Sequence, residues 1–244
     1  MKMEKILSEL KRQYNIVCEE IPECRIIGIF LRGSQNYGLA NENSDVDSVV
    51  LVFPSRKDFI MNREAINYTI DDEDNKIQVL DIRLFFNQLR KSSPNCLELM
   101  FTKYYHLNLD YHSFWENIVS KREEIAYLDK NRLMQSLRGF VCTNMKQFKN
   151  VADKQHKKGY QVLRIWEQVC GIVNGKTYEE SLQSKFIVTK MLKNKEIPAD
   201  DFVLEFGELA CTKIDNLTPY ETKDKDVLDA LQSGIMLAYI RRVF

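Results

Sequence analysis

Two short groups of polar residues carry the clearest chemical signal in this 244-residue sequence. Gly33 and Ser34 follow an apolar run at 26–31, and Asp45 and Asp47 open a second apolar run. Apolar runs of this length between turn residues are typical of buried strands. Because successive side chains of a strand point to opposite faces, we expect Asp45 and Asp47 to project from the same face.

The types of these residues suit a divalent cation and a phosphorylated molecule. Two carboxylates that point together repel each other unless a cation lies between them. Mg²⁺ prefers such hard oxygen ligands and takes its remaining ligands from water and substrate phosphates. The amides and the hydroxyl of Gly33 and Ser34 can hold phosphate oxygens, because a glycine lets the backbone approach a ligand closely. The spacing therefore predicts a site for Mg²⁺ and a phosphate.

The loop between the two runs resembles that of a known family. Its sequence is Gly33-Ser34-Gln35-Asn36-Tyr37-Gly38-Leu39, and Ser44-Asp45-Val46-Asp47 follows it. This pattern is similar to the DNA polymerase beta superfamily of nucleotidyltransferases. Within that superfamily it is most similar to the predicted bacterial and phage nucleotidyltransferases with a Gly-Ser-x-x-Tyr-Gly-Leu loop. The similarity is strong over residues 25–101 and patchy beyond them.

Two later stretches are similar to the same family. The first runs from Leu80-Asp81-Ile82 to Cys96-Leu97-Glu98, and the second is Lys158-Gly159-Tyr160-Gln161-Val162-Leu163-Arg164. The second stretch departs from the family's pattern, because Gln161 stands where a histidine is expected. Any role of that imidazole is therefore not transferred to this chain.

The resemblance implies an activity and a metal site. Such enzymes move a nucleoside monophosphate from a nucleoside triphosphate to a hydroxyl acceptor and release pyrophosphate, with Mg²⁺ or Mn²⁺ as the cofactor. By the same resemblance, Asp45 and Asp47 would bridge two metal ions, and Asp81 would bind the ion beside the attacking hydroxyl. These three carboxylates are the predicted catalytic and metal-binding residues.

A further set of residues is predicted to contact the nucleotide: Gly33, Ser34, Arg32, Tyr37, Lys158 and Arg164. The first two would hold the β- and γ-phosphates. Arg32 and Tyr37 would contact phosphate and base, or else serve the loop's own structure. Lys158 and Arg164 would neutralise the triphosphate or the acceptor's phosphates. The alternatives are a solvated helix face for Lys158 and an ion pair between helices for Arg164.

The position of Asp81 admits a second interpretation. It lies near the end of an otherwise apolar strand predicted over 77–82, where a carboxylate is costly without a partner. It also precedes a helical pattern at 84–89, and aspartate caps helix N-termini well. The resemblance favours a metal ligand, whereas a cap would make the residue structural.

The periodicity of the chain predicts an α+β fold, with a nucleotidyltransferase-type mixed sheet, flanking helices and an all-helical C-terminal half. An amphipathic helix at 4–19 is expected to pack on the sheet, and two strands flank the acidic turn 71–76 as a hairpin. Only helical patterns follow residue 103. We therefore predict a catalytic domain at 1–105 and a helical domain at 106–244.

Composition narrows the class of protein further. Lys plus Arg equals Asp plus Glu at 35 each, so any surface for nucleic acid must be local. The sequence holds no apolar run of membrane-spanning length. Its six cysteines include no C-x-x-C pair, and its three histidines lack ligand spacing, which argues against zinc. These features predict a cytoplasmic protein without membrane contact.

Two functions of different classes remain open at this point. The first is the enzyme, whose acceptor would be an RNA (a tRNA or a damaged end), a protein side chain or a small molecule. The second is a non-catalytic nucleotidyltransferase-fold binding protein, such as an antitoxin or a defence-system regulator that acts with a protein partner. An intact Gly-Ser pair and three candidate carboxylates favour the enzyme, whereas a lost carboxylate would favour the binding protein.

Overall fold

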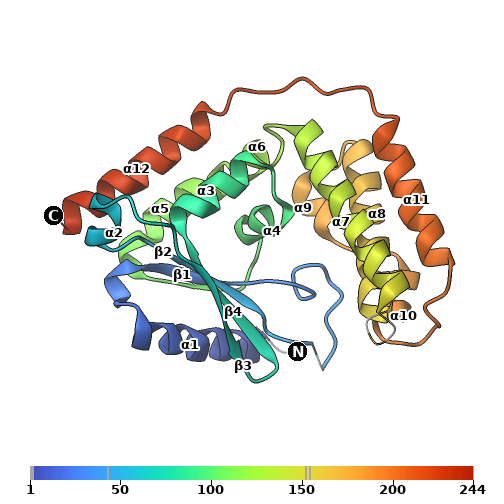
Figure 1. Cartoon of the computed structure of the whole chain (residues 1–244), viewed down its shortest axis with the longest axis horizontal. Helices are drawn as coiled ribbons and strands as arrows, with labels where there is room; N and C mark the ends of the chain where they lie inside the picture. Colours follow the sequence, from blue (N-terminus) through green and yellow to red (C-terminus); the bar gives the residue numbers. More distant parts are fainter. Residues whose placement is uncertain (1–2, 43, 152, 154, 244) are drawn as a thin grey trace.

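The computed structural model describes residues 3–42, 44–151, 153 and 155–243 of the chain. Its centre is a five-stranded sheet with the strand order β3-β4-β2-β1-β5 (Figure 1). The strands are β1 (Ile26–Leu31), β2 (Ser48–Val52), β3 (Asn67–Asp72), β4 (Asn75–Asp81) and β5 (Tyr105–Leu107). β2 and β4 run parallel, whereas the other neighbouring pairs run antiparallel. The predicted α+β class with a mixed sheet is therefore confirmed.

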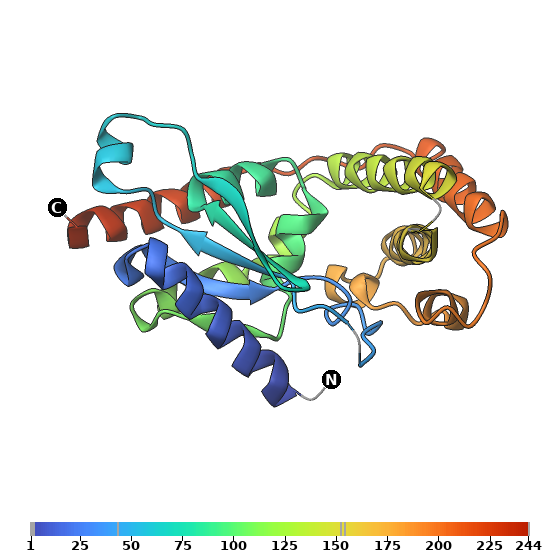
Figure 2. The same cartoon turned by 60° about the horizontal axis from the view of Figure 1, so that its bottom comes forward.

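Helices flank the sheet and build the second half of the molecule. They are α1 (Met3–Glu20), α2 (Arg56–Ile60), α3 (Ile82–Arg90), α4 (Pro94–Leu97), α5 (His112–Ser120), α6 (Arg122–Ala126), α7 (Lys130–Asn150), α8 (Gln155–Val173), α9 (Tyr178–Leu182), α10 (Ile187–Lys193), α11 (Phe202–Asp215) and α12 (Asp226–Val243). Figures 1 and 2 show α7, α8, α10 and α11 grouped beside the sheet rather than over it. In the described part of the chain, no helix is long and apolar enough to cross a membrane.

The two central strands, β1 and β2, are buried over their whole length because helices cover both faces of the sheet. On one face, Ile29 and Val50 share a core cluster with Leu10 of α1. On the other face, Phe30 packs on Trp115, with 4.2 Å between the ring centroids. The near-continuous apolar sequences of the two strands follow from this double burial, and the predicted packing of the N-terminal helix on the sheet is confirmed.

A strand beyond residue 103 was not predicted. β5 pairs with β1 at the edge of the sheet, with His106 opposite Ile29, so the sheet extends two residues past the predicted boundary at 105. Three residues are too few to show the alternation of a strand in the sequence. The pairing with β1 defines this element, and pairing is a tertiary contact.

The C-terminal helix returns to the first half of the molecule. After α11, residues 216–225 form the connection that leads back across the molecule (Figure 1). The next helix, α12, packs on α3 and α5. The Tyr239 ring stacks on Phe53 with 4.1 Å between centroids, and its hydroxyl donates to the Pro54 carbonyl oxygen at 2.7 Å. The domain division at 105/106 stays a prediction, and the last helix of the predicted domain 106–244 packs in part on α3, which precedes that boundary.

Gly28 lies where β5 runs close to β1. A Cβ at this position would lie 2.7 Å from Leu107 Cδ2 and 2.9 Å from the His106 carbonyl oxygen. We expect Gly28→Ala to displace β5 and to lower the free energy of unfolding by about 1–3 kcal/mol, the usual cost of overpacking. Gly234→Ala in α12 is the matched control, since a Cβ there would meet nothing within 4 Å. An unchanged melting temperature for Gly28→Ala would contradict this tight approach.

Candidate functional site

The loop after β1 takes its shape from two glycines. Gly33 and Gly38 have φ angles of +93° and +73°, a backbone conformation that other residues rarely adopt. The amides of Asn36 and Leu39 donate to the carbonyl oxygens of Gly33 and Ser34, which closes the loop into successive turns. A Cβ on Gly33 would meet nothing within 4 Å. This glycine therefore serves the backbone conformation and leaves open space beside the loop.

Asp45 and Asp47 lie just before β2, on either side of the buried Val46. Val46 belongs to the core cluster under α1, so the alternation of side chains turns both carboxylates away from α1. Asp47 Oδ1 accepts from the Lys76 backbone amide at 2.9 Å. Asp45 is exposed, and its carboxylate lies 4.0 Å from Lys157 Nζ of α8. The two carboxylates thus lie between the sheet and the helical half.

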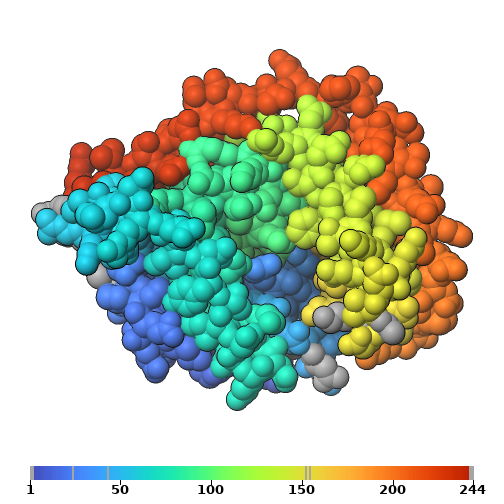
Figure 3. Space-filling model, in the orientation of Figure 1, coloured from blue at the N-terminus to red at the C-terminus, as the bar shows by residue number. Residues whose placement is uncertain are grey.

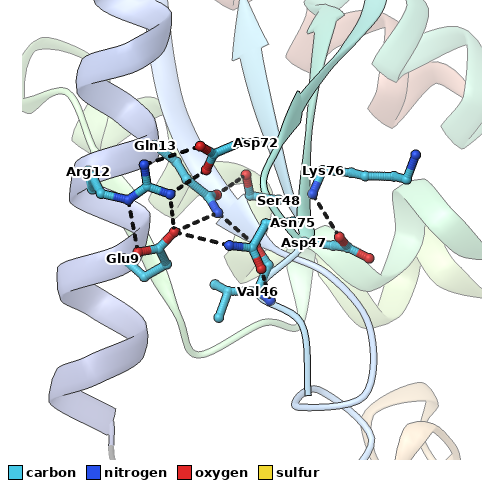
Figure 4. A network of polar contacts seen from close by, with 9 residues as sticks. All are labelled: Glu9, Arg12, Gln13, Val46, Asp47, Ser48, Asp72, Asn75 and Lys76. Atoms are coloured by element: carbon cyan, nitrogen blue, oxygen red, sulfur yellow. Dashed lines mark hydrogen bonds and ion pairs between the residues drawn. The ribbon is translucent and has the colours of Figure 1, made fainter. Parts of the chain in front are cut away.

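A polar network behind the loop holds this segment (Figure 4). The buried Gln13 side chain of α1 donates to the Val46 carbonyl oxygen at 2.8 Å and accepts from the Ser48 hydroxyl at 2.6 Å. Asn75, the first residue of β4, accepts from the Val46 amide at 2.8 Å. Figure 4 shows Glu9 beside them, where it accepts from the side-chain amides of Gln13 and Asn75. The segment is therefore fixed mainly through its backbone.

The surroundings of Asp47 favour a bound cation. Burial raises the pKa of Asp47 above its ordinary value, and the charge of Asp45 adds to this rise. The hydrogen bond from Lys76 and the charges of Lys157 and Arg32 oppose it. A divalent cation would offset both the burial and the repulsion. Two neighbouring carboxylates fit Mg²⁺ or Mn²⁺, because such ions complete their coordination with water and substrate phosphates.

The structure does not bring Asp81 together with Asp45 and Asp47, the two carboxylates with which it was predicted to bind a metal. Asp47 precedes β2, whereas Asp81 lies beside Val52 at the other end of the same parallel strand pair. Five residues of extended chain separate the two positions, which is roughly 16 Å. Among the described residues, no group of three His, Cys, Asp or Glu side chains is placed to hold a metal ion.

Asp81 instead caps α3. Its Oδ1 accepts from the Arg83 backbone amide at 2.9 Å, and its two oxygens bond the Arg83 guanidinium at 3.0 and 2.7 Å. The Asp81 side chain is completely buried. A buried carboxylate with this many donors is satisfied by the helix that it begins.

A cavity of about 820 Å³ lies between the sheet and the helices α7 and α8. Figure 3 shows a hollow in this region, between the strands β3 and β4 in teal and α7 in yellow. The volume is in the range of about 300–1,000 Å³ that small-molecule sites occupy. The predicted site residues that line it are Arg32, Gly33, Ser34, Tyr37, Asp47, Lys158 and Arg164. Asp45 lies next to Asp47, outside the lining.

Glu98, which was not among the predicted site residues, holds the loop from inside. Its carboxylate accepts from the Gly33 amide at 3.2 Å and from the Tyr37 hydroxyl. Burial raises the pKa of Glu98, and the charges of Arg32 and Arg164 oppose this rise. The signal that could have found it is a glutamate inside an apolar segment, where a carboxylate needs partners.

These contacts change the interpretation of the loop residues. Tyr37 is 8% exposed, its hydroxyl is bonded, and the Arg164 guanidinium lies 4.0 Å from its ring centroid. These contacts favour the alternative in which Tyr37 serves the loop's own structure. The Gly33 amide is occupied by Glu98. The Ser34 amide and hydroxyl have no partner among the described residues, which leaves both available as donors.

Arg164 combines burial with an unused donor. Burial lowers the pKa of Arg164, which still carries its charge at neutral pH, and Glu98 opposes this shift. Its Nη1 donates to Gln168 at 3.5 Å, whereas its buried Nε has no partner in the described part of the chain. Arg164 also lines the cavity, and a guanidinium at a cavity wall is suited to bind a phosphate oxygen.

The two interpretations of Asp81, as a helix cap and as a metal ligand, predict different effects of its substitution. Asp81→Asn should keep the cap and the activity per folded molecule, because asparagine caps about as well as aspartate. Asp81→Ala should lower the free energy of unfolding by about 3–5 kcal/mol, because the mostly buried Arg83 guanidinium loses its partner. Nucleotide turnover measures the activity of Asp81→Asn, and chemical denaturation measures the stability of Asp81→Ala. A large loss of turnover in a stable Asp81→Asn protein would restore Asp81 as a metal ligand.

The raised pKa of Asp47 predicts the pH dependence of metal binding. A protonated carboxylate does not bind the ion, so Mn²⁺ affinity should fall with decreasing pH at values above the ordinary aspartate value of 3.8. Calorimetric titration from about pH 7 to about pH 4.5 measures this. The metal-free Asp47→Asn protein should melt at a higher temperature at neutral pH, because a destabilising buried charge is removed. Affinity unchanged down to pH 4.5 would contradict the assignment.

Comparison with known proteins agrees with the predicted superfamily. The RNA repair pathway DNA polymerase beta family (RlaP) matches residues 2–193. No curated protein matches the chain. A nucleotidyltransferase-like protein from Exiguobacterium sibiricum is a solved structure with 10% sequence identity and a TM-score of 0.34, over 96% of this chain and 79% of that chain. Because the family match spans most of the sequence, the chain belongs to the RNA repair pathway DNA polymerase beta family of the DNA polymerase beta superfamily.

Proposed function

We propose that this protein is a divalent-metal-dependent nucleotidyltransferase that moves a nucleoside monophosphate from a nucleoside triphosphate to a hydroxyl group of an RNA and releases pyrophosphate. One observation carries the proposal: Asp47 lines the same cavity as Ser34, Arg32 and Arg164. A carboxylate for a metal and cations for phosphates are what such a transfer requires, since its barrier lies mostly in charge and alignment.

Each residue has a distinct task in this reaction. Asp45 and Asp47 would hold Mg²⁺ or Mn²⁺, which, when bound, neutralises phosphate charge and activates a hydroxyl. The acceptor oxygen forms a bond to the α-phosphorus, the bond from that phosphorus to the pyrophosphate oxygen breaks, and the hydroxyl proton passes to solvent water. Arg32 and Arg164 would offset the charge of the pyrophosphate, while Ser34 would donate to its oxygens.

RNA is the acceptor that the surroundings of Asp45 favour. The name of the family refers to an RNA repair pathway. Beside Asp45, which lies outside the cavity lining, Lys157 Nζ is 4.0 Å from the carboxylate and Lys193 Nζ is 3.4 Å from Ser44 Oγ. Two lysines at this place suit the phosphodiester backbone of an acceptor whose end reaches the metal.

A non-catalytic nucleotide-binding protein is the second candidate, and one observation favours it. The β4 residues nearest to Asp47 that line the cavity are Lys76 and Gln78 rather than a third carboxylate. Such a protein would bind the triphosphate without turnover and act through a partner. Turnover therefore separates the two candidates.

The test uses each of the four ribonucleoside triphosphates with an α-phosphate label, together with cellular RNA and Mg²⁺. The proposal expects label in RNA and an equal amount of pyrophosphate. Asp45→Asn and Asp47→Asn should lower transfer by about 10³-fold or more without lowering the melting temperature. Asp81→Asn is the control carboxylate variant. Triphosphate binding without pyrophosphate release would favour the second candidate, and label in protein would reject RNA as the acceptor.

A further inference from the structure

The cavity has a wall whose chemistry differs from that of its charged side. The residues of α7 that line it, called here the α7 wall, are Gln135, Ser136, Gly139, Phe140, Thr143, Asn144 and Gln147. Among the described lining residues, none from α7 is charged. The basic residues of α7 lie outside the lining: Lys130, Arg132, Arg138, Lys146 and Lys149. A helix that is basic elsewhere thus presents an uncharged polar face to the cavity, which suits a neutral ligand group.

Amide side chains around this wall have unused hydrogen-bonding groups. Gln135 and Gln147 lie on α7, Gln88 lies near the end of α3, and Asn95 lies in α4; all four line the cavity. Their side chains have no hydrogen-bond partner among the residues that the structure describes. Each amide offers both a donor and an acceptor. This mixture matches the edge of a nucleobase, which carries donors and acceptors side by side.

Gly139 gives the wall an open position. A glycine inside a helix destabilises it relative to alanine, and a Cβ on Gly139 would meet nothing within 4 Å. Packing within the protein therefore does not require a glycine here. Its neighbour Phe140 is a partly buried ring that packs on the core and lines the cavity. Open space beside an aromatic ring fits a flat group.

We propose that the α7 wall binds the nucleobase of the transferred nucleotide, with the base held by the amides over Gly139. This inference rests on the proposed function. The charged side of the cavity would hold the triphosphate, and the wall extends about 18 Å from Gln135 to Gln147 at 1.5 Å per residue. The acceptor reaches the metal from the side of Asp45, outside the lining, which leaves the wall to the nucleotide.

The most direct test places a side chain in the open space beside Gly139. Gly139→Ala and Gly139→Leu should weaken nucleoside triphosphate binding progressively, because the added side chain occupies the place of the base. The affinity should fall by about tenfold or more for leucine. Gly234→Ala and Gly234→Leu are matched controls, since Gly234 is also a helical glycine with nothing within 4 Å of its Cβ. Alanine should not lower the melting temperature at either position, so a loss of binding in Gly139→Ala is not a loss of fold.

Binding of inorganic tripolyphosphate distinguishes the contribution of the phosphates to affinity from that of the base. In calorimetry with Mg²⁺, Gly139→Leu should bind tripolyphosphate as the wild type does and lose affinity only for the triphosphates. Gln135→Ala should change the order of affinity among ATP, GTP, CTP and UTP. Equal triphosphate affinity in Gly139→Leu and wild type would overturn the inference. So would a loss confined to RNA binding, which would assign the wall to the acceptor.

A failure of the proposed function would look different. If the wild type transfers no nucleotide and binds no tripolyphosphate, the enzyme proposal fails, and the wall is then tested with adenosine, guanosine, cytidine and uridine alone. Binding of one of them that Gly139→Leu abolishes would support the wall by itself. If tripolyphosphate binds as tightly as every nucleoside triphosphate, the base contributes nothing, and the inference is rejected even where transfer is observed.

Discussion

The buried carboxylate of Glu98 is the interaction on which the geometry of the site depends. It accepts from the Gly33 amide and the Tyr37 hydroxyl, and thereby ties both ends of the loop to the segment after α4. A charge in the core persists only with partners. The charges of Arg32 and Arg164 supply part of this compensation. The loop, the segment after α4 and α8 therefore all contribute partners to one buried carboxylate.

The same loop also joins the two halves of the molecule. The Tyr37 carbonyl oxygen accepts from the Ser184 amide at 3.0 Å, and the Asn36 carbonyl oxygen accepts from the Gln183 side chain at 2.7 Å. Glu167 of α8 accepts from the Ser184 hydroxyl at 2.6 Å, which fixes this connection to the helices. At the opposite end, α12 crosses back onto α3 and α5. The two halves are thus joined at the loop after β1 and again through α12.

Local patterns in the sequence were sufficient for the elements and for part of the site. The alternation of Asp45, Val46 and Asp47 placed both carboxylates on one side, because the period of two in extended chain is a property of the backbone itself. The glycine pattern of the loop indicated its turns for a similar reason, since a positive φ at Gly33 is a local requirement. The same loop pattern pointed to the superfamily, which the family match confirms.

Only the tertiary structure decided which distant residues meet. The parallel register of β2 and β4 separates Asp81 from Asp47, although both are acidic residues at strand ends. Glu98 is near in space to Gly33 but 65 residues away in sequence, and no local period encodes such a contact. The return of α12, the pairing of β5 and the uncharged face of α7 likewise depend on long-range packing. Sequence periodicity specifies which face of an element is apolar. Which other element packs on that face depends on contacts throughout the chain.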